Sequence, residues 1–67
     1  MSAWDRSQRA HYAQKTLAES RVLELVCRQF AANYATGDAR KALLEQADEL
    51  VRFQEQIRVW IEIWRLQ

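Results

Sequence analysis

The sequence predicts an all-α fold, an antiparallel two-helix hairpin of the coiled-coil type, and three observations support this prediction. The 67 residues include no proline and only one glycine, so residue 37 is the one obvious helix break. Large apolar residues recur at alternating spacings of three and four on both sides of this glycine, the pattern of a helical seam. The length suits one small domain, so residues 1–67 are expected to form a single hairpin.

The first predicted helix spans about residues 3–35. Ser2 and Asp5 resemble a capping box, in which side chains three residues apart bond reciprocally to free backbone N–H groups at a helix start. The expected seam of this helix consists of Thr16, Ser20, Leu23, Cys27, Phe30 and Tyr34. Before this seam the pattern is weaker, and the sequence leaves open whether the first dozen residues form a separate short helix.

The predicted turn spans residues 36–38. Gly37 can adopt the left-handed conformation that commonly ends a helix, because it has no Cβ atom. Asp38 suits the N-cap of the next helix, since its carboxylate can accept hydrogen bonds from free backbone N–H groups. A connection this short makes the two helices antiparallel neighbours.

The second predicted helix spans about residues 39–66 and has the clearer pattern. Its expected seam consists of Leu43, Gln46, Leu50, Phe53, Ile57, Trp60 and Trp64. Each helix also carries a second apolar stripe: Leu44, Val51, Val59, Ile63 and Leu66 here, and Ala18, Val22 and Leu25 in the first helix. A hairpin buries one seam only, so the second stripe predicts that another chain covers it.

The last turns of the chain concentrate this apolar excess. Seven of the ten residues from 57 to 66 are large and apolar. Tryptophan is enriched at interface hot spots, and Trp60 and Trp64 fit either the hairpin core or an interface. The residues predicted to bind a partner are Leu44, Val51, Val59, Trp60, Ile63, Trp64 and Leu66.

Composition and charge exclude several classes of function. A formal net charge of +1 argues against a strong nucleic-acid binder, which usually carries a clear basic excess. One cysteine and one histidine cannot form an internal disulfide or a structural zinc site, and no cofactor is expected. His11 is expected to be solvated and Cys27 to be a buried small hydrophobe, so the sequence predicts no enzyme. Without an apolar leader or a span of ~20 apolar residues, a cytoplasmic location is expected.

The chain resembles a known family at its turn and along its second helix. The resemblance rests on Gly37-Asp38-Ala39-Arg40, followed by Leu50, Phe53, Ile57, Val59 and Trp60. With its two helices and its length, this pattern is similar to the small co-chaperones of type III secretion needle subunits (the YscE/EscE type). The resemblance implies a cytosolic protein that binds a tetratricopeptide-like chaperone and helps keep a needle subunit soluble before export.

A second interpretation belongs to another class. Two copies of the hairpin could form a homodimeric four-helix bundle that buries the second stripe and serves as an RNA-binding or regulatory protein. The basic residues of the first helix favour this interpretation: Arg6, Arg9, Lys15, Arg21 and Arg28. Glu19 and Glu24 dilute that basic face, and a solvated helix surface explains it equally well. The sequence therefore favours a protein partner over a nucleic acid.

Overall fold

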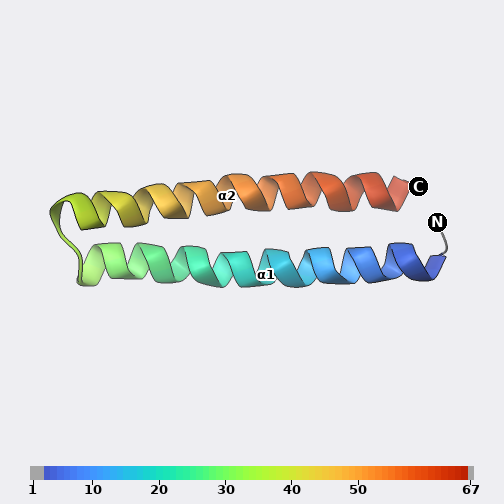
Figure 1. Cartoon of the computed structure of the whole chain (residues 1–67), viewed down its shortest axis with the longest axis horizontal. Helices are drawn as coiled ribbons and strands as arrows, with labels where there is room; N and C mark the ends of the chain where they lie inside the picture. Colours follow the sequence, from blue (N-terminus) through green and yellow to red (C-terminus); the bar gives the residue numbers. More distant parts are fainter. Residues whose placement is uncertain (1–2, 67) are drawn as a thin grey trace.

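Two long antiparallel helices form the whole of the computed structural model, which describes residues 3–66 and the side chains of residues 4–65 (Figure 1). Helix α1 spans Ala3–Asn33 and helix α2 spans Gly37–Leu66. No strand occurs in the described part of the chain. The predicted hairpin is confirmed, and α1 is continuous from Ala3 to Asn33, so residues 3–12 belong to this helix and do not form a separate short one.

The Cα atoms extend over 50 × 14 × 11 Å, so the molecule is a single layer of two helices. Within residues 3–66, neither helix has an apolar stretch long enough to cross a membrane. A single layer gives each helix one neighbour only, and the rest of its surface remains open to solvent or to another molecule.

The turn lies at residues 34–36, two residues earlier than predicted. The carbonyl of Phe30 accepts hydrogen bonds from the backbone N–H groups of Tyr34 (2.9 Å) and Ala35 (3.0 Å), which ends α1. Gly37 has a φ of 59°, the predicted left-handed conformation, but it begins α2 and does not follow α1 directly. Asp38 lies within the first turn of α2, where a carboxylate interacts favourably with the helix dipole.

The seam between the helices consists of residues spaced alternately three and four apart on each helix. In α1 these are Ala10, Ala13, Leu17, Ser20, Glu24, Cys27 and Ala31, and in α2 they are Leu43, Ala47, Leu50, Gln54, Ile57, Ile61 and Trp64. All fourteen are buried or half-buried. Among residues 4–65, the buried apolar residues are Ala31, Ala47, Ile57 and Ile61, so this part of the hairpin by itself buries little apolar surface.

The predicted seams were therefore only partly right. Ser20, Cys27, Leu43, Leu50, Ile57 and Trp64 belong to the observed seam. Thr16, Leu23, Phe30 and Tyr34 of α1, and Gln46, Phe53 and Trp60 of α2, are exposed. Apart from Tyr34, which follows the last residue of α1, each lies one residue before a seam position, so both helices are rotated by roughly 50–60° from the predicted arrangement. Small residues such as Ala31 and Ala47 occupy the seam, which allows the two backbones to approach closely.

Polar side chains fix the register of the two helices near the middle of the seam. The Gln54 amide Nε2 donates to Oε1 of Glu24 at 2.9 Å, and Nε of Arg28 donates to Oε2 of Glu24 at 3.0 Å. Arg28 also approaches Asp48 of α2, with Nη2 and Oδ1 separated by 3.6 Å. The hydrogen bond from Gln54 and then that from Arg28 lower the pKa of Glu24. Because a polar pair needs its partner opposite, this cluster disfavours sliding of one helix along the other.

Two isoleucines of α2 provide a matched test of this seam. Ile61 is 7% exposed and Ile63 is 43% exposed. We expect Ile61→Ala to reduce the free energy of unfolding by about 2–5 kcal/mol, because it removes buried apolar atoms and leaves a cavity. Ile63→Ala should reduce the free energy of unfolding by well under half of the loss caused by Ile61→Ala. Urea denaturation at low micromolar concentration measures both values, and equal losses would contradict the observed rotation of α2.

The cluster around Glu24 also predicts a dependence on pH. The pKa of Glu24 is lowered in the fold, so its carboxylate stabilises the hairpin above its ordinary pKa of 4.5. This contribution is lost as the pH falls through the lowered value. The difference in melting temperature between the natural chain and Glu24→Gln should therefore shrink below about pH 4.5. Thermal melts followed by circular dichroism measure it, with Glu55→Gln as the control, and a constant difference would refute the prediction.

Candidate protein-binding face

The hairpin has two broad sides, which the seam defines. In an antiparallel pair, the residues immediately before the seam positions of both helices share one side, and the residues immediately after them share the other. The contact between Arg28 and Asp48 agrees with this geometry, because each follows a seam residue on its own helix. The two sides differ sharply in composition.

The side formed by the residues before the seam positions is mostly apolar, and we call it the apolar face. Of its fourteen positions, seven are large and apolar: Tyr12, Leu23, Val26, Phe30, Phe53, Trp60 and Ile63. These side chains are between 42% and 61% exposed, so about half of each lies uncovered. Three positions are charged: Arg9, Glu19 and Glu49. An apolar patch of this size on so small a protein marks an interaction surface.

On the opposite side, charged residues outnumber large apolar ones. Seven of its fourteen positions are charged: Arg21, Arg28, Asp48, Glu55, Arg58, Glu62 and Arg65. Leu25, Leu44 and Val51 are its large apolar residues. Both signs of charge are mixed, and Arg65 pairs with Glu62 at 3.3 Å. This side is a solvated helix surface of ordinary composition, which directs attention to the apolar face.

Aromatic residues extend the apolar face at both ends of the hairpin. The rings of Phe30 and Tyr34 lie 5.3 Å apart near the turn, beside a shallow groove of about 510 Å³ that Gln29 and Asn33 also line. Near the open end, the indole rings of Trp60 and Trp64 lie 5.9 Å apart and are tilted by 40°. Trp60 belongs to the apolar face and Trp64 to the seam, so the two indole rings connect the apolar face with the last position of the seam.

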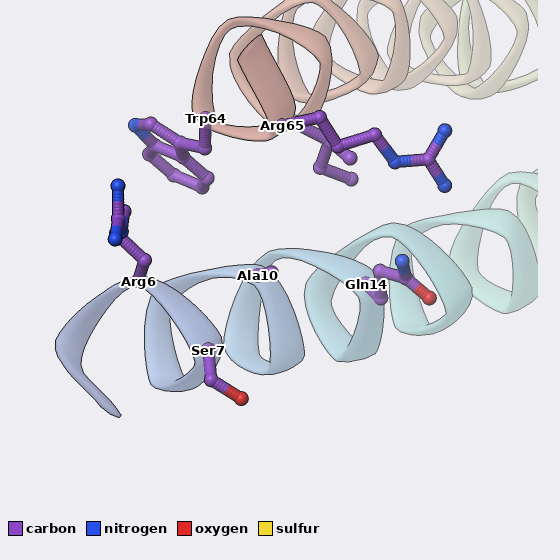
Figure 2. Close-up of a pocket in the computed structure, with 7 residues that line it drawn as sticks. Arg6, Ser7, Ala10, Gln14, Trp64 and Arg65 are labelled. Atoms are coloured by element: carbon purple, nitrogen blue, oxygen red, sulfur yellow. The ribbon is translucent and has the colours of Figure 1, made fainter. Parts of the chain in front are cut away.

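A second groove, of about 350 Å³, lies on the charged side at the open end of the hairpin (Figure 2). Arg6 extends from α1 toward the Trp64 indole, and the small side chain of Ala10 lies between the two helices. Ala10, Ile61 and Trp64 line the groove together with Arg6 and Arg65. It is less extensive than the apolar face, which spans most of the hairpin.

The structure separates the seven predicted partner-binding residues into several groups. Trp60 and Ile63 lie on the apolar face, and Trp64 is half-buried at the end of the seam. Leu44 and Val51 lie on the charged side, while Val59 is 58% exposed on the outer surface of α2. Leu66 lies in the last turn of α2, and its side chain is outside the described residues. The predicted residues therefore do not form one surface.

Five residues of the apolar face were missed by the sequence pattern as binding candidates: Tyr12, Leu23, Val26, Phe30 and Phe53. Leu23, Phe30 and Phe53 were assigned to the seam, because bulky residues at heptad spacing usually form the core. The sequence nevertheless contained a signal that the seam lies one residue later than predicted. Four alanines recur at the same three-and-four spacing, shifted by one residue: Ala10, Ala13, Ala31 and Ala47. A seam of small residues beside a row of bulky ones is compatible with close helix packing that leaves the bulky row outside.

Residues with reactive side chains form no metal-binding cluster in the described part of the chain. His11 is exposed, with its ring 5.6 Å from that of Tyr12. Cys27 is half-buried in the seam, which is more accessible than the fully buried position that was expected. Among residues 4–65, no three histidine, cysteine or acidic side chains gather into a possible metal site.

Comparison with known proteins gives no assignment. No family model matches the sequence, and comparisons with curated proteins and with solved structures give no significant match. The function must therefore be inferred from the fold and from the surface just described.

The exposed apolar side chains predict that the isolated chain binds a hydrophobic dye. We expect bound anilinonaphthalene sulfonate to fluoresce strongly, and Leu23→Gln combined with Phe53→Gln to reduce this fluorescence by about half or more. The matched control is Leu25→Gln combined with Leu44→Gln, which removes a similar apolar area from the charged side. Equal reductions by the two double variants would contradict a single apolar face.

Proposed function

We propose that this chain is a non-enzymatic protein-binding module that packs its apolar face against a helical partner. In the form suggested by the family resemblance, it is a cytosolic co-chaperone that binds a tetratricopeptide-like chaperone and helps keep a type III secretion needle subunit soluble before export. The observation that carries the proposal is the cluster of seven large apolar side chains, all at least 42% exposed, on one side of a single-layer hairpin.

The energetics of the hairpin support this proposal. Burying a large apolar side chain contributes roughly 1.5–3 kcal/mol. Among residues 4–65, the buried apolar residues are two isoleucines and two alanines. Small domains without disulfides or metals usually need a partner to reach a useful stability. Covering the apolar face would supply the missing burial, so binding and folding would stabilise each other.

The distribution of charge also supports a protein partner. The apolar face has three charged positions among fourteen, and its aromatic residues are of the types enriched at interface hot spots. The basic residues of α1 do not gather on one surface: Arg9 precedes a seam residue, whereas Arg21 and Arg28 follow seam residues and lie on the opposite side. A polyanion would require those residues to act together.

Variants of α2 test whether the apolar face binds the partner. We expect Trp60→Asp and Ile63→Asp to abolish association, because a carboxylate buried without a partner at an interface is costly. Val59→Asp is the matched control, since Val59 is exposed on the outer surface of the same helix. The measurement is co-elution in gel filtration after co-expression with the tetratricopeptide-like chaperone and the needle subunit of a type III secretion system.

Circular dichroism should show that all three variants keep most of their helix content. Loss of binding by Val59→Asp but not by Trp60→Asp would move the interface to the outer surface of α2. Failure of the natural chain to co-elute with either protein would refute the co-chaperone proposal.

A further inference from the structure

We infer that the apolar face binds one amphipathic helix of a partner protein, and that basic residues flank the apolar stripe of that helix. This inference rests on the proposed function and specifies the chemistry of its partner. Its geometry comes from the apolar face, and the sign of the partner's charge comes from Glu19 and Glu49.

The apolar face has the dimensions of a seat for a third helix. Its central rows, nearest the seam, consist of Thr16, Leu23 and Phe30 on α1 and Gln46, Phe53 and Trp60 on α2. From Tyr12 to Phe30 the face runs for about 27 Å, the length of roughly 18 helical residues. A helix about 10 Å wide that lies over the seam contacts both central rows at once and completes a three-helix bundle.

Two carboxylates border this seat on opposite edges. Glu19 lies on the outer edge of the apolar face in α1, and Glu49 lies on the outer edge in α2. Both side chains are exposed, and neither takes part in an ion pair among the described residues. The only basic residue of the face is Arg9, ten residues from Glu19 along α1, or about 15 Å at the rise of a helix. Because Gln54 lies opposite Glu24 in the antiparallel pair, Glu49 lies level with Gln29, near the turn end of the seat, whereas Glu19 lies nearer its middle. Each edge of the seat therefore carries one carboxylate.

These charges favour a basic helix over a second copy of the chain. Two copies that met through their apolar faces would bring four glutamates and two arginines into one interface, leaving an excess of like charge in a partly desolvated site. The acidic edges also disfavour an anionic lipid surface. A helix with lysine or arginine beside its apolar stripe meets Glu19 and Glu49 with opposite charge and covers the same apolar side chains.

Two synthetic peptides of 21 residues test this inference against the full chain (the peptide length is roughly that of the seat, with about one extra turn). Both peptides carry leucine at heptad positions a and d, and they differ only in having lysine or glutamate at the flanking positions. Binding is measured by tryptophan emission in 150 mM salt, roughly the physiological ionic strength. We expect the lysine peptide to bind about tenfold more tightly than the glutamate peptide.

Charge reversal on the chain should reverse this preference. Glu19→Lys combined with Glu49→Lys should favour the glutamate peptide. The control, Glu55→Lys combined with Glu62→Lys, makes the same change in net charge on the opposite side and should still favour the lysine peptide. Circular dichroism checks that both double variants remain helical.

The outcomes separate this inference from the proposed function. Equal binding of the two peptides, or a preference that Glu19→Lys and Glu49→Lys do not reverse, would overturn the basic-helix inference and leave the apolar face as the binding surface. If neither peptide binds and sedimentation shows a stable dimer, a second copy covers the face and the inference is wrong. If neither peptide binds to a monomeric chain, both the inference and the proposed function fail.

Discussion

The structure depends on a seam in which mostly small residues of α1 pack against mostly larger residues of α2. Ala10, Ala13, Ala31 and Ala47 lie at seam positions where many coiled coils place leucine or isoleucine. Small side chains let the helix backbones approach each other, and they leave no room in the seam for the bulky residues beside them. Phe30, Phe53 and Trp60 lie beside the seam and are about half exposed.

This packing explains why the molecule has two different sides. A row of bulky residues precedes the seam positions in both helices, and charged residues are more frequent after the seam positions than before them. An antiparallel arrangement therefore places the two bulky rows on one side and the two charged rows on the other. In a parallel pair, the apolar row of one helix would lie beside the charged row of the other. The short turn at residues 34–36 enforces the antiparallel arrangement, and the Gln54, Glu24 and Arg28 cluster holds its register.

The same constraint links stability to binding. The seam combines alanine, serine and a glutamate–glutamine pair with leucines and isoleucines, while seven large side chains of the apolar face remain 42–61% exposed. Further hydrophobic stabilisation is therefore available on the apolar face. A partner helix laid over that face would convert the single layer into a bundle with a continuous apolar core. Residues such as Leu23 and Phe53 would then contribute to the fold and to the interface at the same time.

The sequence by itself determined the helices, their antiparallel order and the excess of apolar surface, because these features depend on local signals: the absence of proline, the single glycine and the three-four spacing. It did not determine which of two adjacent heptad rows forms the seam. Both rows share Leu43, Leu50, Ile57 and Trp64, and they differ by one residue at the positions between them. Only the tertiary structure decided between Phe53 and Gln54, or Trp60 and Ile61, because the choice depends on how closely two particular backbones approach and on a hydrogen bond between residues thirty positions apart.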